Sequence, residues 1–300
     1  MDRSCQEPLA EVLDQNRQIL MVSGPRQVGK TTLAKSLLMH KGCSNNYLTW
    51  DDSVQRELIL AGTPRIVSQL SLDQLSSRPP MVAFDELHKY KHWKNFLKGL
   101  FDQYELDVRF MVTGSARLNL FNKGGDSLMG RYFHYRLHPL SVAELSSGLV
   151  DEQIIQSPVD VDQEMYEKLL QFGGFPEPFF KADRRFSNRW QSSRMEQLLY
   201  EDIREGSKIH ELKQLEVLAS LLCMQASKET KYSSLAKAVR VSVDTIRRWL
   251  DVLETLGFMP QCCKPWGCSI SLPNWRVQLR ILLVSKSCQP SCQSGQEYRV

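Results

Sequence analysis

The sequence contains no apolar run of the roughly 20 residues that a membrane-spanning helix needs. Its first residues also lack the basic, apolar and small-residue order of a secretory signal peptide. From these absences we expect a cytoplasmic protein with no membrane-embedded part. Apolar residues make up 42% and charged residues 24% of the 300 residues, which is typical of a globular chain with one large or two smaller domains.

The body of the chain has no excess of charge of either sign. Thirty-eight Lys and Arg residues stand against 34 Asp and Glu residues, and from Lys264 onward there are five basic residues and one acidic residue. Residues 1–263 therefore carry 33 of each sign. A neutral body gives no electrostatic support for nucleic-acid binding by the folded part of the chain.

Cysteine is scarce outside the last 40 residues. Three scattered cysteines, Cys5, Cys43 and Cys223, are expected to be reduced and structural in the cytoplasm. The other five are Cys262, Cys263, Cys268, Cys288 and Cys292. They lack paired C-x-x-C spacing and have no histidine nearby, so a zinc site is disfavoured.

One short stretch organises the chain. Residues 24–31 read G-P-R-Q-V-G-K-T, the G-x-x-x-x-G-K-T spacing of a phosphate-binding loop. An apolar segment typical of a buried strand precedes it at residues 18–23, and helix-forming residues follow at 31–39. Glycines permit the tight turn, and the N–H groups at a helix N-terminus suit phosphate oxygens. The alternative is a Gly-rich turn with an unrelated lysine, but the correct flanks on both sides favour nucleotide binding.

This loop predicts the nucleotide site and its cofactors, ATP and Mg²⁺. We expect Lys30 to reach the β- and γ-phosphates and the Thr31 hydroxyl to be a Mg²⁺ ligand. The predicted nucleotide-binding residues are Gly24, Pro25, Arg26, Gln27, Val28, Gly29, Lys30, Thr31 and Thr32.

A second strong pattern is an apolar run that ends in two carboxylates. Residues 81–84 run directly into Asp85 and Glu86, as a buried parallel strand does at its carboxyl end. We expect this strand to lie beside the P-loop strand, with Asp85 holding Mg²⁺ through its water shell and Glu86 polarising the attacking water. The alternative is a strand followed by an acidic helix cap. The P-loop upstream favours the catalytic interpretation.

Residues 108–113 predict another buried strand. Thr113 and Ser115 stand at its exit, where a small polar side chain can contact the γ-phosphate or the attacking water, or can simply close the strand. Further strands are predicted at residues 47–50 and 132–137. Strands that alternate with helical segments predict an α/β fold, a five-stranded parallel sheet with helices on both faces. Nucleotide should bind at the carboxyl ends of the strands.

Beyond residue 148 the pattern becomes helical. Residues 232–259 have helix-turn-helix spacing, and residues 258–260 would lead into a wing. In a DNA-binding protein the residues facing the groove would be Ser242, Asp244, Thr245, Arg247 and Arg248. Acidic residues on the same helix and the neutral body count against duplex contact. A packing or partner surface is therefore the alternative.

Together these segments resemble a prokaryotic AAA+ ATPase family that joins an AAA domain to a C-terminal domain beginning with a winged helix and continuing into a nuclease-like fold. The resemblance covers roughly residues 10–266. Its carriers are G-P-R-Q-V-G-K-T-T at 24–32, V-A-F-D-E-L-H-K at 82–89, F-M-V-T-G-S-A-R at 110–117, S-L-M-G-R at 127–131, H-P-L-S at 138–141 with Glu144, and G-G-F-P-E-P-F at 173–179.

The resemblance implies a role for each matching position. Walker A corresponds to residues 24–31, Walker B to Asp85 and Glu86, and sensor 1 to Ser115 or Thr113. Arg131 stands where AAA+ proteins carry an arginine finger, which implies action in trans within a homo-oligomer. A structural salt bridge is the alternative for Arg131.

The resemblance also divides the chain. The predicted parts are an AAA+ nucleotide-binding domain at 1–148, a helical lid or linker at 149–210, a winged-helix domain at 211–266 and a divergent, disordered tail at 267–300. After Trp266 the family's continuation is missing, and a frameshifted or truncated reading frame or a genuinely divergent end would explain this. The nuclease-like portion is therefore in doubt.

The expected function is Mg²⁺-dependent ATP hydrolysis that drives remodelling of a DNA- or protein-bound partner. The alternative is a nucleotide-switched DNA- or protein-binding module with little turnover.

Overall fold

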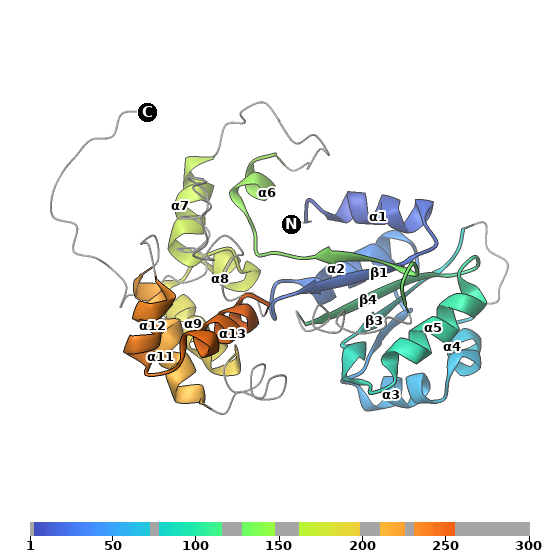
Figure 1. The fold of residues 1–300 in the computed structure, drawn as a ribbon. Helices are drawn as coiled ribbons and strands as arrows, with labels where there is room; N and C mark the ends of the chain where they lie inside the picture. Colours follow the sequence, from blue (N-terminus) through green and yellow to red (C-terminus); the bar gives the residue numbers. More distant parts are fainter. Residues whose placement is uncertain are drawn as a thin grey trace. The chain divides into compact units, whose positions relative to one another are not determined.

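The computed structural model describes residues 3–72, 78–115, 128–147, 162–198, 211–225 and 231–255 (Figure 1). The chain divides into two compact units, which we treat separately. The first comprises Met1–Tyr166, Phe175–Glu177 and Leu253–Phe258, and the remainder forms the second. Among the described residues, no helix is long and apolar enough to cross a membrane.

The first unit alternates strands and helices. Its strands are β1 (Ile19–Gly24), β2 (Tyr47–Thr49), β3 (Met81–Asp85), β4 (Arg109–Ser115) and β5 (Tyr132–Arg136). Its helices are α1 (Gln6–Gln15), α2 (Lys30–His40), α3 (Ser53–Leu60), α4 (Thr63–Gln69), the short 3₁₀ helix η1 (Leu87–Lys89), α5 (Trp93–Tyr104) and α6 (Val142–Ser147). The connections from β1 to β2, from β2 to β3 and from β3 to β4 each contain helix, as crossovers between parallel strands usually do.

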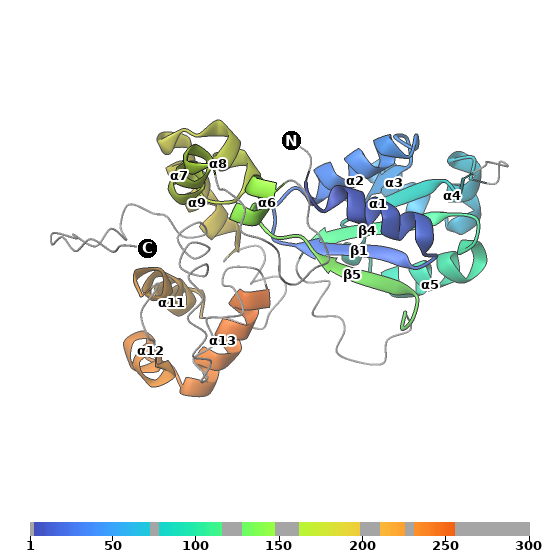
Figure 2. The same ribbon diagram turned by 90° about the horizontal axis from the view of Figure 1, so that it is seen from above.

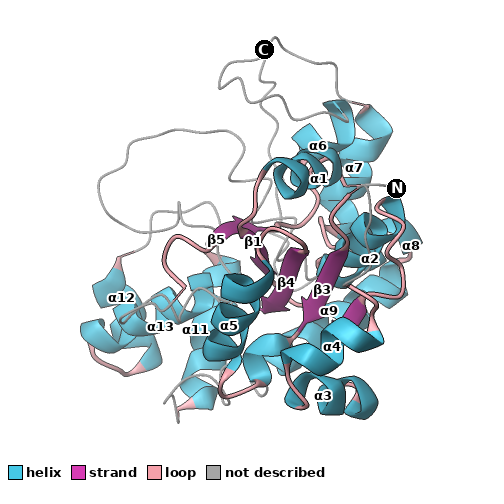
Figure 3. Ribbon diagram, turned by 90° about the vertical axis from the view of Figure 1, so that its right-hand side faces the viewer, coloured by secondary structure: helices cyan, strands magenta, loops and turns pink. Residues whose placement is uncertain are grey.

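All five strands pair in parallel in the order β2-β3-β4-β1-β5, and Figure 3 shows the sheet between its helices. This confirms the predicted α/β fold of a P-loop NTPase. The expected adjacency of β3 and β1 is wrong, because β4 pairs with both and lies between them. Strand order depends on how each crossover packs in three dimensions, and the order of motifs along the chain does not encode it.

The pairing register brings the polar strand ends together. Asp85 of β3 lies opposite Thr113 of β4, and Gly24 of β1 lies opposite Ser115 of β4. The carboxyl ends of three neighbouring strands therefore meet at one edge of the sheet, where α/β folds bind ligands.

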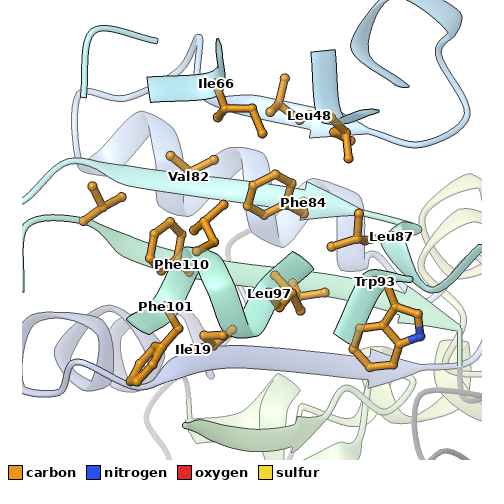
Figure 4. Packing of buried hydrophobic residues seen from close by; sticks show 14 of the residues in the cluster. Ile19, Leu48, Ile66, Val82, Phe84, Leu87, Trp93, Leu97, Phe101 and Phe110 are labelled. Carbon is orange, nitrogen blue, oxygen red and sulfur yellow. The ribbon is translucent and has the colours of Figure 1, made fainter. Parts of the chain in front are cut away.

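One face of the sheet packs against α3, α4 and α5. Ile19, Phe84 and Phe110 project from β1, β3 and β4 toward Trp93 and Leu97 of α5 (Figure 4). Full burial of each such side chain contributes about 1.5–3 kcal/mol to folding. This cluster fixes the strands from which the site residues extend.

The opposite face is covered by α2, with α1 packed beside it (Figure 1). Leu33 and Leu37 of α2 are buried, as is Leu13 of α1. The alternate residues of β1, Leu20 and Val22, are also fully buried. A strand buried on both faces accounts for the continuous apolar run before the P-loop.

Among the described residues, the remaining helices are α7 (Gln163–Phe172), α8 (Pro176–Lys181), α9 (Arg184–Gln197), α11 (Leu212–Met224), α12 (Tyr232–Val239) and α13 (Val243–Thr255). The α12–α13 pair is joined by a short turn (Figure 2). Arg240 adopts the left-handed conformation there, with a φ of 61°. Ser242 caps α13, because its Oγ accepts a 3.0 Å hydrogen bond from the N–H of Thr245.

The predicted domain boundaries remain predictions. Residues 148–161 and 199–210, which belong to the predicted boundary and linker, lie outside the described residues. So do the predicted wing at 258–260 and the tail at 267–300. The α12–α13 pair has the predicted helix-turn-helix spacing, but a winged helix remains a prediction.

Candidate nucleotide-binding site

The loop between β1 and α2 has the backbone of a phosphate cradle. Gln27 and Gly29 both have positive φ, 62° and 101°. At Gly24 an added Cβ would lie 2.4 Å from the Leu137 carbonyl oxygen, so only glycine fits there. Successive N–H groups in such a turn, followed by a helix N-terminus, form a concavity that attracts anions.

Lys30 lies against this loop at the first turn of α2. Its side chain is buried, and its Nζ donates hydrogen bonds to the carbonyl oxygens of Gly24 at 3.1 Å and Pro25 at 2.7 Å. The ammonium group is thereby held close to the loop backbone. Thr31 and Thr32 follow it in the first turn of the helix.

Three hydroxyl groups converge on Asp85. Thr31 Oγ1 donates to Asp85 Oδ2 at 2.7 Å, Tyr47 Oη donates to the same oxygen at 2.5 Å, and Thr113 Oγ1 donates to Oδ1. Burial alone would raise the pKa of Asp85, but the three hydrogen bonds outweigh it and hold the pKa below its usual value. Asp85 is therefore an ionised, buried carboxylate at the carboxyl end of β3.

Glu86 is held in a sparsely populated conformation. Its φ and ψ are 55° and 22°, and its N–H donates a 3.0 Å hydrogen bond to the Thr113 carbonyl oxygen. Its Oε2 lies 3.6 Å from Lys89 Nζ and 3.7 Å from His88 Nε2. Burial raises the pKa of Glu86, although the Lys89 charge acts against it. A carboxylate with a raised pKa is a better proton acceptor than an ordinary one.

Thr113 and Ser115 lie two positions apart on β4 and so share one face of that strand. Thr113 contacts the Asp85 carboxylate, whereas Ser115 Oγ lies 3.3 Å from His88 Nε2. The structure therefore brings together the predicted residues of the P-loop, β3 and β4.

Arg131 lies apart from this group. It precedes β5, whose first residue Tyr132 pairs with Ile19 at the amino end of β1, five residues before the loop begins at Gly24. At about 3.3 Å per residue, β1 separates Arg131 from the loop by roughly 17 Å. Its guanidinium donates to the Asp102 carboxylate at 2.6 and 3.3 Å. Within the chain Arg131 thus forms a salt bridge, as the alternative interpretation expected. Its action on the nucleotide of a neighbouring subunit remains a prediction.

The sequence analysis missed two contributors to the site. Tyr47 contacts Asp85 because β2 pairs with β3 in a register that sets Thr49 opposite Asp85. No sequence pattern marks that pairing. His88 lies within the V-A-F-D-E-L-H-K motif at 82–89, which predicts no role for it. Its position two residues after Glu86 was the available signal.

The residues present fit a nucleotide with a hard cation. Thr31 and Asp85 offer two oxygens only 2.7 Å apart, and Mg²⁺ prefers oxygen ligands of this kind. The cradle between Gly24 and Lys30 offers positive charge and backbone N–H groups to phosphate.

Comparison with known proteins agrees with this geometry. Residues 16–146 match a family model described as an AAA domain. The match supports a P-loop AAA domain in the first part of the chain. Residues 163–273 match a model described as a domain of unknown function (DUF8612).

Curated relatives extend the similarity over both parts. An uncharacterized protein of Mycobacterium tuberculosis, Rv2008c, is 24% identical over 252 residues, which is 84% of this chain and 51% of the relative. An uncharacterized protein of Methanocaldococcus jannaschii, MJ1544, is 22% identical over 227 residues, 74% of this chain and 50% of the relative. The chain therefore spans about half the length of these relatives.

Solved structures show a weaker likeness. AMPPCP-bound DnaA from Aquifex aeolicus has a TM-score of 0.41 and 13% identity, with 83% of this chain and 86% of that chain covered. The ORC1 protein of Aeropyrum pernix, solved in complex with DNA, has a TM-score of 0.38 and 12% identity, with 86% and 85% covered. Values this low support no inference about function.

Proposed function

We propose that the AAA domain binds ATP with Mg²⁺ and hydrolyses it, and that the protein uses this cycle to remodel a DNA- or protein-bound partner. The observation that carries the proposal is the convergence on Asp85. Hydroxyls from α2, β2 and β4 meet one buried carboxylate beside the phosphate cradle, and Glu86 stands next to it. This arrangement suits a nucleotide site with an adjacent general base.

Each residue of the site has a role in this proposal. The loop from Gly24 to Gly29 would bind the phosphates through its N–H groups, and Lys30 would bind the β- and γ-phosphates. Thr31 and Asp85 would hold Mg²⁺, the second through its water shell. Bound Mg²⁺ would neutralise charge on the phosphate oxygens.

Glu86 would accept a proton from the attacking water. Its raised pKa and its place beside the candidate metal ligands support this role. Ser115, with Thr113 behind it, would orient the water or the γ-phosphate from the end of β4. Arg131 would act on the nucleotide of a neighbouring subunit, which requires a homo-oligomer.

One observation favours the alternative of a nucleotide-switched module with little turnover. The Glu86 carboxylate lies between Lys89 and His88, and Lys89 also contacts Asp51 at 2.6 Å. These contacts would hold the base back until a partner or a conformational change releases it. Slow basal turnover would follow.

The exposed side chains of α13 bear on which class of partner the protein binds. Asp244, Arg247 and Arg248 are exposed on this helix, but Arg247 lies 3.4 Å from Asp244 and over the ring of Tyr232. Because this ion pair is exposed it is weak, and Arg247 could exchange it for a phosphate at little cost. We therefore retain DNA and a protein client as the two partner classes.

Steady-state ATP hydrolysis tests the proposal. Wild-type protein should turn over ATP many times, Lys30→Ala should lose nucleotide binding, and Glu86→Gln should bind ATP with little hydrolysis. Lys91→Ala, at an exposed lysine, is the matched control and should behave as wild type. If Lys30→Ala bound ATP with wild-type affinity, the assignment of the nucleotide site would be wrong. If the wild-type protein bound ATP tightly but hardly hydrolysed it, the result would favour the nucleotide-switched module.

The same assay with duplex DNA separates the partner classes. Stimulation that persists when the chain is cut after Trp266 would support a DNA-coupled ATPase in the body of the protein. Stimulation that disappears with the cut would move the contact to the basic tail. Hydrolysis indifferent to DNA in both samples would favour a protein client.

A further inference from the structure

The amino-terminal segment of the chain is tied to the phosphate-binding loop by Arg3. Its Nη1 donates a 2.9 Å hydrogen bond to the carbonyl oxygen of Val28, and its Nη2 donates at 2.7 Å to the carbonyl oxygen of His138. The Arg3 side chain is 13% exposed. An arginine 25 positions before the loop residue it contacts is thus largely buried beside the loop.

Glu144 of α6 holds this arginine in position. Its Oε1 lies 2.5 Å from Arg3 Nε and its Oε2 lies 3.1 Å from Nη2, a two-point contact that fixes the plane of the guanidinium. Glu144 Oε1 also accepts a 3.3 Å hydrogen bond from the N–H of Ser4. The Glu144 side chain is 8% exposed, so solvent screens the pair weakly.

The contact at Val28 sets the direction of the next N–H group. A trans peptide is planar, and its C=O and N–H point in opposite directions. Because the Val28 carbonyl oxygen points to Arg3, the N–H of Gly29 points away from Arg3. A Cβ at Gly29 would lie 3.9 Å from Arg3 Nη1, which places the guanidinium directly beside this peptide.

The segment that carries Glu144 also touches the start of the loop. The carbonyl oxygen of Leu137 lies 2.4 Å from where a Cβ on Gly24 would be, and the adjacent His138 carbonyl oxygen accepts a hydrogen bond from Arg3. One segment, residues 137–144, therefore holds both ends of the loop. It contacts the loop directly at Gly24, and it reaches Val28 through Arg3.

We propose that Arg3 and Glu144 form a brace that holds the Val28–Gly29 peptide with its N–H toward the phosphate side of the loop. Both are positioning residues, because they act through the loop backbone. This inference rests on the proposed nucleotide binding, and it adds that ATP affinity depends on an arginine outside the loop motif. The brace also couples α6 and the amino-terminal segment to the bound phosphate.

The affinity test compares Arg3→Ala with Arg17→Ala. Arg17 forms an exposed ion pair with Glu105 at 2.8 Å, so its loss removes a charge of the same type away from the loop. Arg3→Ala should weaken Mg²⁺-ATP binding about tenfold, the effect of one charge-assisted hydrogen bond, while Arg17→Ala keeps wild-type affinity. Arg3→Lys retains a donor but loses the two-point contact, so its affinity for Mg²⁺-ATP should lie between those of Arg3→Ala and Arg17→Ala. Glu144→Gln should show a smaller loss than Arg3→Ala.

Amide hydrogen exchange of residues 24–33 without nucleotide tests the brace itself. Exchange should rise in Arg3→Ala and Glu144→Gln and stay at the wild-type level in Arg17→Ala. Wild-type exchange in folded Arg3→Ala would overturn the brace, whatever the affinity. If exchange rose in Arg3→Ala but its affinity for Mg²⁺-ATP stayed at the wild-type value, the proposed effect of the brace on nucleotide binding would be wrong. If the wild-type protein failed to bind ATP, the proposed function would fall, and the exchange measurement would still decide the brace.

Discussion

Thr31 and Asp85 are joined by a 2.7 Å hydrogen bond between residues 54 positions apart in the sequence. The contact ties the first turn of α2 to the last residue of β3 across the inserted strand β4. Since both residues are the candidate metal ligands, their oxygens are already adjacent before any ligand binds. Preorganisation of this kind lowers the free energy that binding must supply.

Asp85→Asn should destabilise the fold as well as weaken Mg²⁺-dependent nucleotide binding. An amide has one oxygen acceptor and one NH₂ donor, so it cannot accept from Thr31, Tyr47 and Thr113 as the carboxylate does. We expect a loss of about 1–3 kcal/mol in the free energy of unfolding, measured by urea denaturation. Asp102→Asn, at an exposed carboxylate, is the control and should leave the free energy of unfolding close to that of the wild type. Equal losses in both variants would contradict the special role of Asp85.

Arg131→Ala and Asp102→Ala separate the trans role from the local ion pair. If Arg131 acts on a neighbouring subunit, its removal should abolish hydrolysis, and mixing with Glu86→Gln subunits should restore part of it. Asp102→Ala removes the partner of Arg131 and keeps the arginine, so it should retain hydrolysis. The measurement is the rate of mixed samples whose oligomeric state is verified. Equal loss of activity in both variants, with no recovery on mixing, would instead assign Arg131 to the ion pair alone.

Gly24→Ala and Gly99→Ala should have opposite effects on stability. At Gly24 the new Cβ would lie 2.4 Å from the Leu137 carbonyl oxygen, whereas at Gly99 in α5 it would meet nothing within 4 Å. Overpacking at Gly24 should cost about 1–3 kcal/mol and disturb the loop. Alanine at Gly99 should stabilise the helix by about 0.5–1 kcal/mol. Thermal unfolding of the two variants provides the measurement, and a stabilised Gly24→Ala would refute the close approach.

Histidine in β5 should make stability depend on pH near neutrality. Partial burial and then the charge of Arg136 lower the pKa of His134, whose Nε2 lies 2.8 Å from Ser23 Oγ. The pKa of a histidine in the unfolded chain is about 6.5, above the lowered pKa of His134 in the folded protein. Below this pH the unfolded chain therefore binds more protons than the folded protein does. Stability should therefore fall as the pH drops from about 6.5 through the lower folded pKa.

His134→Gln should flatten this dependence, and the double variant with His138→Gln should flatten it further, because burial lowers the pKa of His138 as well. The midpoints of urea unfolding, measured between pH 5 and 8, give the slope of stability against pH. A slope identical to the wild type in both variants would show that neither histidine is responsible.

Much of the AAA domain could be predicted from local patterns. The P-loop, its flanking strand and helix, and the strand ending in Asp85 and Glu86 each occupy a short stretch with a distinct period and composition. Gly62 and Pro64 mark the break between α3 and α4 in the same local way, because glycine and proline interrupt helices. These features depend on neighbours in sequence, which is why they were predictable.

The features that escaped prediction depend on distant partners. The insertion of β4 between β1 and β3 follows from packing of whole crossovers. Tyr47 reaches Asp85 only through the register of β2 on β3, and Arg131 pairs with Asp102 only after α5 and β5 come together. No spacing rule in the sequence encodes such contacts. The proposed roles of the site residues remain predictions for the assays above.

The backbone at Glu86 has an evolutionary consequence. A left-handed conformation costs an L-residue about 1–2 kcal/mol, and glycine would avoid that cost. Random substitution under selection for stability alone would therefore replace this glutamate. The chain thus keeps a carboxylate at a position where glycine would avoid this cost, as the proposed role of Glu86 as a base requires. A library of this protein sorted only for thermal resistance should enrich Glu86→Gly, and those survivors should be its least active members.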